Sequence, residues 1–340
     1  MFDDGLLDDE VALDRADPRL RLLAESGARV RRETVAAEDA LRDAVASLGE
    51  TRPRAVVAAG PDSRLLRAVL EPVCPVPFLA WPGPGLPGWA GSLDLVVVLA
   101  PEGRDPATAR AVAEAVRRGC QLVVAAPPES LVAEHAVGHY ATVLPTATRD
   151  QLATAVVMLE LLDRLQLGPA TDPDVVATAL DQVAVECSPR RDLAVNPAKI
   201  LAIAIADTTP MFWGGTVLAA RAGRRIAESV RRATGRTALA ADAEHLLPVL
   251  EATPRADVFA DPLLDGTGDR RPALVVLDDG TDDPLARETR EQLARTADAH
   301  DVRVETLSSM AEGQVARYAA LLATGTYAAE YLSIGLAGRH

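Results

Sequence analysis

The sequence predicts an α/β protein with two doubly wound parallel sheets, each forming a three-layer sandwich with its helices. Three observations favour this class: short Val, Ala and Leu-rich runs alternate with helical segments from residue 55 onward, the hydrophobic fraction is 49%, and aromatic residues make up only 3%. Apolar strands that alternate with helices are typical of a parallel sheet covered on both faces. We therefore expect two α/β halves rather than an all-β fold.

The first half of the chain contains five expected strands with helices between them. The strands are expected at residues 55–59, 76–81, 93–100, 121–126 and 141–144, and the helices at residues 63–70, 107–118 and 130–137. Residues 1–50 are expected to form a helical lead-in, because apolar residues recur at helical spacing over residues 33–48. The predicted boundaries are thus 1–50 for the lead-in and 51–170 for the first domain.

The second half repeats the alternation after a helical connector at residues 171–195. Helices are expected at residues 149–167, 172–189, 197–206, 216–233, 243–251, 284–299 and 311–336, and strands at residues 210–213, 236–241, 273–277 and 302–307. This pattern predicts a second domain over residues 196–340. Turn-rich loops at residues 82–91 and 257–268 are expected near strand ends, where ligands of open α/β sheets bind.

Composition excludes several classes of partner. The chain carries 49 Asp and Glu against 35 Lys and Arg, a formal net charge of -14. Nucleic acids and anionic membrane surfaces are bound through clustered Lys and Arg, so we expect neither partner. No apolar run approaches the roughly 18 residues that a membrane span needs, and the N-terminus lacks a basic, apolar leader. We expect a cytoplasmic protein.

The sequence contains no cofactor or metal motif. The first strand is followed by A-G-P-D-S at residues 59–63 rather than by GxGxxG, and GxxxxGK[ST], HExxH and GxSxG are absent. The three cysteines form no CxxC pair, and the one histidine pair with helical spacing, His135 and His139, has no further ligand to complete a metal site. We therefore expect no cofactor and no metal.

Four short motifs carry a family resemblance. Arg149 opens a long predicted helix, N-P-A-K at residues 196–199 precedes an apolar helix, Pro210 is followed by Gly214, and E-Y-L-S lies at residues 330–333. In this order the elements resemble the bifunctional phosphoglucose/phosphomannose isomerases, over roughly residues 20–337. Those are sugar isomerase (SIS) domain proteins, so the resemblance implies two SIS-like subdomains, a small phosphorylated sugar as ligand and a homodimer. The apolar helix at residues 318–336 is a candidate for the dimer contact.

The resemblance implies a substrate site on the loops of the first half. The family binds phosphate with a loop like S-Y-S-G-N-T before a helix, and the matching residues 100–105 read A-P-E-G-R-D. Gly103 is retained and Arg104 adds a cation, but the serines are replaced and two acidic residues enter. The family's first glycine-rich loop is reduced to Gly60 and Ser63. Arg149 matches a family arginine near the substrate; its alternative is a surface arginine at a helix start.

Two alignments of the catalytic region remain open. Aldose-ketose isomerisation needs a carboxylate that moves a proton and a His or Lys that opens the ring. The family base lies in a stretch like R-x6-E-N-x-K, with its histidine about sixteen residues later. In one register Arg221 and Glu228 match, and His245 falls one residue late. In the other, which keeps the strand at residues 236–241 in place, the Glu falls on Ala233 and both catalytic groups are lost.

The family's C-terminal catalytic lysine has no counterpart. The sequence ends nine residues after Tyr331, and its one lysine is Lys199. We expect that role to be vacant or filled by Arg or His, and Arg is a poor substitute because it stays protonated. The resemblance thus implies a sugar-phosphate binding protein and a possible aldose-ketose isomerase acting on glucose 6-phosphate or mannose 6-phosphate. The alternative is a catalytically degenerate SIS protein that acts as a binding or regulatory partner.

Overall fold

The computed structural model describes residues 2–49, 52–255 and 270–337 of the chain, so the loop expected at residues 257–268 lies outside the described residues. Its contacts divide the chain into two compact units. The first-sheet unit comprises Ser26–Thr178, and the second-sheet unit comprises Met1–Glu25 together with Ala179–His340. Each unit contains one parallel sheet.

The first sheet has five parallel strands in the order β2-β1-β3-β4-β5. The strands are β1 (Val56–Ala59), β2 (Phe78–Trp81), β3 (Leu95–Leu99), β4 (Gln121–Ala126) and β5 (Ala141–Pro145). The direction of winding reverses between β1 and β3, which pair directly with Ala59 opposite Val98. In sheets of this kind, the crevice beyond the carboxyl ends of the strands is where ligands bind.

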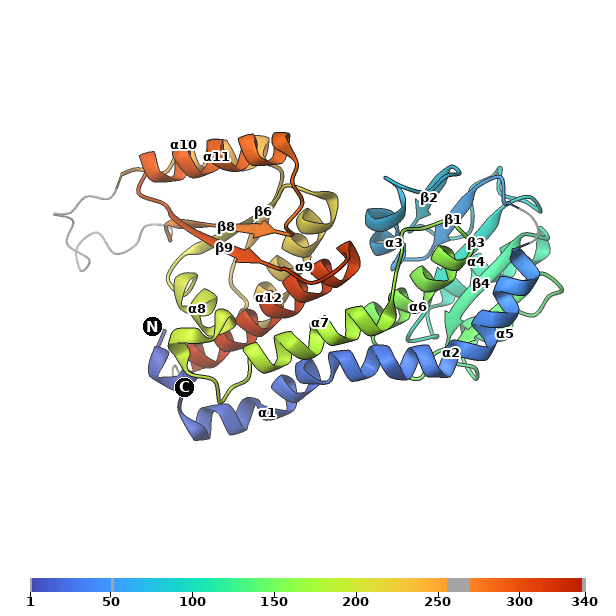
Figure 1. The fold of residues 1–340 in the computed structure, drawn as a ribbon, viewed down its shortest axis with the longest axis horizontal. Coiled ribbons are helices and arrows are strands. Elements are labelled where there is room, and N and C mark those ends of the chain that lie inside the picture. Colours follow the sequence, from blue (N-terminus) through green and yellow to red (C-terminus); the bar gives the residue numbers. More distant parts are fainter. Residues whose placement is uncertain (1, 50–51, 256–269, 338–340) are drawn as a thin grey trace. The chain divides into compact units, whose positions relative to one another are not determined.

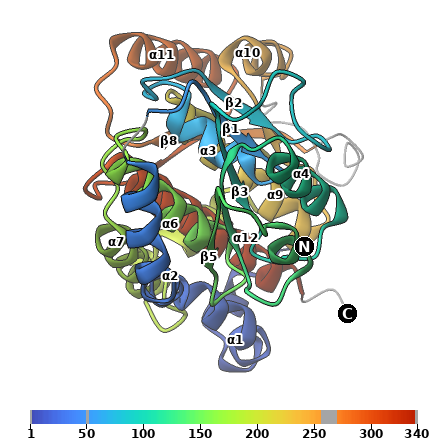
Figure 2. The ribbon, with the colours of Figure 1, turned by 90° about the vertical axis from the view of Figure 1, so that its right-hand side faces the viewer.

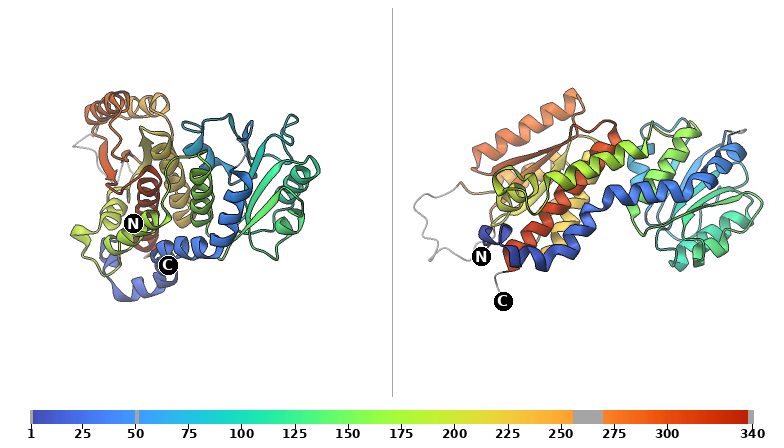
Figure 3. Two further views of the ribbon diagram at one scale, coloured as in Figure 1. Left: turned by 45° about the vertical axis from the view of Figure 1, so that its right-hand side comes forward. Right: turned by 60° about the horizontal axis from the view of Figure 1, so that its bottom comes forward.

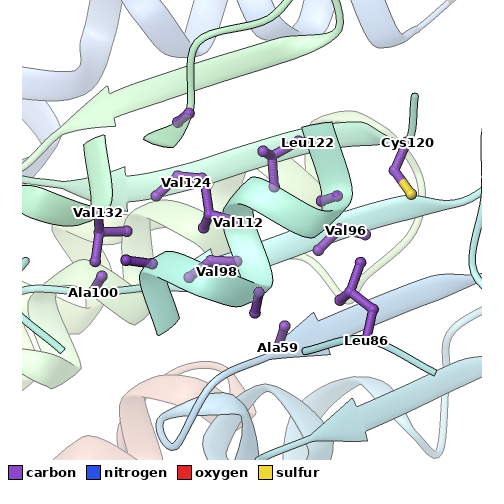
Figure 4. Packing of buried hydrophobic residues seen from close by; sticks show 14 of the residues in the cluster. Ala59, Leu86, Val96, Val98, Ala100, Val112, Cys120, Leu122, Val124 and Val132 are labelled. Atoms are coloured by element: carbon purple, nitrogen blue, oxygen red, sulfur yellow. The ribbon is translucent and has the colours of Figure 1, made fainter. Parts of the chain in front are cut away.

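Helices cover both faces of the first sheet. They are α2 (Ser26–Leu48), α3 (Ser63–Leu70), α4 (Pro106–Arg117), α5 (Leu131–His135) and α6 (Gln151–Arg164). One face packs against α4 and α5 through a dry cluster that includes Val98, Val112, Val124 and Val132 (Figure 4). The other face is covered by α2, α3 and α6, and α2 and α6 run side by side (Figure 1, Figure 2). Alternate side chains of each strand are therefore buried on opposite faces, as the apolar runs predict.

The second sheet has four parallel strands in the order β7-β6-β8-β9. The strands are β6 (Thr209–Gly214), β7 (Leu239–Ala240), β8 (Pro272–Asp278) and β9 (Arg303–Ser308). The strand expected at residues 236–241 shrinks to two residues. One physical reason is that the Ala238 carbonyl accepts a hydrogen bond from Arg231 Nη1, 2.7 Å away, instead of extending the ladder.

Two helical layers enclose the second sheet. They contain α8 (Pro197–Ala204), α9 (Val217–Thr234), α10 (Ala243–Glu251), α11 (Pro284–Ala299) and α12 (Gln314–Leu336), with η1 (Asp4–Leu7) and α1 (Glu10–Ala24) from the N-terminus. Leu246 of α10 and Leu293 of α11 pack on one face with Met211 and Leu274. On the other face lies α9, whose Gly223 approaches Phe212, and α12 packs along α9 (Figure 1). The helix α7 (Pro173–Glu186) and the short η2 (Leu193–Val195) lead into this unit.

The final helix α12 is buried within its own unit. It packs against α8, α9 and α1, and α1 lies beside its C-terminal part (Figure 3). Gly325 permits the close approach of α9, because a Cβ there would lie 2.4 Å from the Ile226 side chain. Tyr327 and Tyr331 are among the largest fully buried side chains. The apolar character of residues 318–336 is thus explained by packing inside the chain, without a second copy.

The two parallel sheets with helices on both faces confirm the predicted fold class. Most predicted elements lie within a few residues of the observed ones. None of the described helices is long and apolar enough to cross a membrane.

Candidate functional site

A cavity of about 410 Å³ lies at the carboxyl edge of the first sheet. It is formed by the loops that follow β3, β4 and β5, and its volume is within the range of roughly 300–1,000 Å³ typical of small-molecule sites. Its lining residues are Glu102, Gly103, Arg104, Pro127, Glu129, Ser130, Leu131, Thr146, Ala147, Thr148 and Arg149. The structure therefore brings together three of the residues predicted from sequence, Gly103, Arg104 and Arg149.

Two polar groups in this cavity have no partner among the residues that the structure describes. Arg149 is exposed, and its guanidinium makes no ion pair or hydrogen bond with any residue that the structure describes. The Thr146 hydroxyl is buried and unpaired within the same described ranges. Arg104, by contrast, pairs with Glu102 at 2.9 Å. A buried hydroxyl without a partner is costly in a folded protein, so both groups are available to a ligand.

Gly103 is required by the backbone of this cavity. Its φ is +65°, a left-handed conformation that favours glycine, and a Cβ there would lie 2.3 Å from the Ser130 Cβ. Ser130 in turn caps α5, because its hydroxyl oxygen accepts from the Ala133 N–H at 3.3 Å. The glycine thus lets the loops after β3 and β4 contact each other. This packing is sufficient to explain why residue 103 is a glycine, and no role in ligand binding is needed.

The loop after β1 holds the other two predicted binding residues. Gly60 has φ +91°, and Ser63 begins α3 with its side chain 1% exposed. The Ser63 hydroxyl has no hydrogen-bond partner among residues 2–49, 52–255 and 270–337. This loop is tied to the start of α6, since Gln151 donates from Nε2 to Asp62. Gly60 and Ser63 do not line the cavity described above.

The N-terminus of α4, where the family loop places phosphate, is occupied by a carboxylate. Asp105 accepts hydrogen bonds from the N–H groups of Ala107 and Thr108, at 3.3 and 2.9 Å, and from the Thr108 hydroxyl at 2.5 Å. The Thr108 hydroxyl is the main cause that lowers the pKa of Asp105 below its usual value. An anion at this helix end would compete with Asp105 for the donors and face its negative charge.

A second cavity, of about 260 Å³, lies at the carboxyl edge of the second sheet. Four aspartates and two arginines line it: Asp278, Asp279, Asp282, Asp283, Arg287 and Arg290. Arg290 pairs with Asp278 at 2.8 Å, and Arg287 pairs with Asp282 at 3.1 Å. Because each cation is neutralised and an excess of carboxylates remains, this cavity is unsuited to a phosphate group.

Glu228 lies on α9 and is half-buried. It pairs with Arg225 at 2.6 Å, three residues earlier. Arg221 lies on the same helical face and hydrogen-bonds the hydroxyl of Tyr318 on α12, and burial raises the pKa of that phenol. Arg221 and Glu228, the pair with the family spacing, thus belong to one polar cluster with Arg225 and Tyr318.

His245 is placed apart from Glu228. It lies on α10 with its side chain 69% exposed, 3.4 Å from Glu244. α10 and α9 cover opposite faces of the second sheet. The structure therefore does not bring Glu228 and His245 together within this unit.

Comparison with known proteins agrees with this architecture. Residues 194–337 match the sequence profile of the bacterial phospho-glucose isomerase C-terminal SIS domain. This segment, which is less than half of the chain, is similar to an SIS domain. No curated protein sequence matches the chain significantly.

Several solved structures share the fold over nearly the whole chain. Tagatose-6-phosphate ketose/aldose isomerase from Escherichia coli superposes with a TM-score of 0.60 at 13% identity, covering 96% of this chain and 92% of that one. A glucose-6-phosphate isomerase like protein from Thermus thermophilus gives a TM-score of 0.53 at 18% identity, with coverages of 98% and 93%. The C-terminal domain of glucosamine-fructose-6-phosphate aminotransferase from Francisella tularensis gives 0.59 at 11% identity, with coverages of 92% and 94%.

The single lysine of the chain lies in a structural environment. Lys199 is 0% exposed, and its Nζ donates to Asp8 Oδ1 at 2.6 Å and to the carbonyls of Pro189 and Arg191 at 2.9 and 3.1 Å. Its ammonium also lies 5.6 Å from the centroid of the Tyr331 ring. All three N–H donors are therefore used, and they connect Asp8 of the N-terminal segment to the carbonyls at residues 189 and 191 within the second-sheet unit.

Sequence reasoning missed Thr146 and the role of Asp105. The sequence Asp105-Pro106 before an apolar helix carried a usable signal, because Asp at the N-cap and Pro at the next position are typical of a helix start. Thr146 gave no such signal. Across the described ranges, no group of three His, Cys, Asp or Glu side chains is placed to hold a metal ion.

Proposed function

We propose that this SIS protein binds a phosphorylated sugar in the cavity at the carboxyl edge of the first sheet. The observation that carries the proposal is the guanidinium of Arg149 in that cavity, which has no partner within the described part of the chain. Arginine matches the geometry of a phosphate with two parallel N–H donors, and such charge-assisted bonds are about twice as strong as neutral ones. The unpaired Thr146 hydroxyl beside it suits a sugar hydroxyl or a phosphate oxygen.

The comparisons support the ligand class. The names of the Escherichia coli and Thermus thermophilus proteins that share the fold both refer to isomerases of hexose 6-phosphates. The cavity contains an arginine, Arg149, that can attract an anion in a chain whose formal net charge is -14. Glucose 6-phosphate, fructose 6-phosphate and mannose 6-phosphate are the first ligands to test.

We propose binding without turnover. Isomerisation needs a free carboxylate base and an acid that opens the ring. Glu228 is paired with Arg225, His245 lies on the other face of the second sheet, and Lys199 is buried with its donors used. The second candidate function, an aldose-ketose isomerase, is favoured by one observation: Arg221 and Glu228 keep the family spacing and lie on one face of α9.

The assembly and compartment are proposals drawn from the family and the composition. We propose a homodimer, whose contact lies elsewhere than on the buried α12. A monomeric mass by light scattering would contradict it. We propose the cytoplasm as the compartment, which agrees with free cysteines at positions 74, 120 and 187.

Calorimetry and a coupled assay test the function together. We expect the three hexose 6-phosphates to bind and to raise the melting temperature, whereas unphosphorylated glucose does neither at the same millimolar concentration. We expect no interconversion of fructose 6-phosphate with glucose or mannose 6-phosphate. Absence of binding by all three phosphosugars would reject the proposal. Interconversion that Glu228→Gln abolishes would establish the isomerase instead.

A further inference from the structure

Glu33 is a buried carboxylate on a helix outside the predicted first domain. It lies on α2 with its side chain 1% exposed. Both of its oxygens accept hydrogen bonds from the loop between β5 and α6: Oε2 from the Ala147 N–H at 2.7 Å, and Oε1 from the Thr148 N–H at 2.7 Å and from the Thr148 hydroxyl. Burial of a carboxylate is costly unless such donors compensate it. All three donors belong to two consecutive residues that line the cavity.

A second side chain of α2 holds the other end of this loop. Arg29 donates from Nε to Asp150 Oδ2 at 2.6 Å, and Asp150 caps α6 through the N–H groups of Leu152 and Ala153. Arg29 and Glu33 are four residues apart, so they lie on one face of α2. The loop is therefore fixed at Ala147 and Thr148 on one side of Arg149 and at Asp150 on the other.

The chemistry of these contacts requires a carboxylate. The two N–H groups and the hydroxyl are all donors, and an ionised carboxylate accepts from several donors at once. A glutamine of nearly the same shape would turn an NH₂ group toward one of these donors, so one backbone N–H would lose its acceptor in a buried place. Glu33→Gln therefore loosens the loop while it preserves the packing volume.

We propose that Glu33 is a positioning residue of the sugar-phosphate site. It holds residues 146–149 so that the Arg149 guanidinium and the Thr146 hydroxyl face the ligand. The inference rests on the proposed function, because it assigns Glu33 a role in the binding of that ligand. The helix α2 therefore helps to hold the loop of the binding site in place.

A double-mutant cycle on the affinity for glucose 6-phosphate tests this role. Calorimetry compares the wild type with Glu33→Gln, Arg149→Met and the double variant. We expect Glu33→Gln to weaken the binding of glucose 6-phosphate about tenfold relative to the wild type. When Arg149 is already replaced by Met, we expect the same change at Glu33 to weaken binding little further. In hydrogen exchange, we expect the Ala147 and Thr148 amides to exchange faster in Glu33→Gln.

Val30→Ala provides the matched control. Val30 is buried on the same helix and carries no polar side-chain group. This substitution should lower the melting temperature by removing core volume, yet leave the affinity for glucose 6-phosphate unchanged. A weaker affinity in Glu33→Gln but not in Val30→Ala separates positioning from a general loss of stability.

Each remaining outcome is decisive. If the wild type binds and Glu33→Gln binds equally well, or if its amides keep their protection, the inference is overturned and the proposed function stands. If Glu33→Gln weakens binding by the same factor with and without Arg149, the effect does not pass through Arg149 and the inference is again overturned. If the wild type does not bind glucose 6-phosphate or the other two phosphosugars, the proposed function fails, and the positioning role fails with it.

Discussion

The carboxyl edges of the two sheets have the same architecture and opposite chemistry. Each edge carries a cavity formed by the loops that follow parallel strands. At the first edge Arg149 has no partner among the described residues, and a buried Thr146 hydroxyl is unpaired. At the second edge both arginines are paired with aspartates. The fold thus supplies a crevice in each half, and the two crevices differ in charge pairing: both arginines of the second are paired, whereas Arg149 of the first has no partner among the described residues.

Lys199 and Tyr331 of the second-sheet unit are used for cohesion. Lys199 holds Asp8 and two carbonyls, and Tyr331 donates to the Cys187 carbonyl at 2.6 Å. Burial raises the pKa of Cys187 to about 12, so this thiol stays protonated at neutral pH. None of these groups is free to act on a ligand.

The largest expected effect on stability follows from Lys199→Met. Removal of the buried ammonium leaves two carbonyls and Asp8 without their donor, and we expect the free energy of unfolding to fall by about 3 kcal/mol in urea titrations. Arg295→Met, on the exposed surface of α11, should change it by less than about 0.5 kcal/mol. A Lys199→Met protein that keeps normal stability but no longer binds phosphosugar would contradict this account, because the lysine would then take part in ligand binding.

Arg149→Met should have the largest effect on binding. Loss of a charge-assisted contact costs about 1.5–3 kcal/mol, so we expect glucose 6-phosphate affinity in calorimetry to fall about tenfold to a hundredfold. The matched variant in the other unit, Arg287→Met, removes a paired arginine from the second cavity and should leave the affinity unchanged. If Arg287→Met weakened binding and Arg149→Met did not, the binding site would lie in the second-sheet unit instead.

Asp105→Asn should have a smaller effect that depends on pH. Hydrogen bonding from Thr108 lowers the pKa of Asp105 in the folded state below the unfolded value of 3.8. The ionised cap therefore stabilises the protein above the unfolded pKa, and this contribution is lost as the pH falls through the folded pKa. We expect the wild type to exceed the variant by about 0.5 kcal/mol at pH 7. The difference should disappear in the acid limb of a stability profile, and a difference that persists there contradicts the assignment.

Glu228→Gln should have the smallest effect. The pair with Arg225 is partly exposed, so its loss should cost about 0.5 kcal/mol or less, and phosphosugar affinity should not change. Glu38→Gln on α2, which removes another exposed pair with an arginine, serves as the control. A large fall in affinity for Glu228→Gln alone would place α9 in the binding site.

The fold was predictable because the spacing of apolar residues that is typical of strands and helices can be read from short stretches of the sequence. Apolar runs such as residues 121–126 and the alternation with helices were sufficient for both parallel sheets. The strand at residues 236–241 was overestimated, because apolar periodicity does not reveal that the Ala238 carbonyl accepts a side-chain hydrogen bond from Arg231. Helix caps such as Asp105 could have been predicted from the sequence, because Asp followed by Pro is typical of a helix start.

The candidate site was predictable only in part. Gly103, Arg104 and Arg149 were selected from a family pattern, and the structure places them in one cavity. Glu33 could not be found from sequence, because its partners Ala147 and Thr148 lie 114 and 115 residues away. Whether a hydroxyl such as that of Thr146 is left unpaired likewise depends on packing that local periodicity does not encode.

Hydrogen exchange with and without saturating glucose 6-phosphate tests the central claim most directly, because it reports on both sheet edges in one experiment. The account predicts that added protection is confined to residues 102–104 and 146–149. Protection at residues 278–283 instead, with residues 146–149 unchanged, would contradict it.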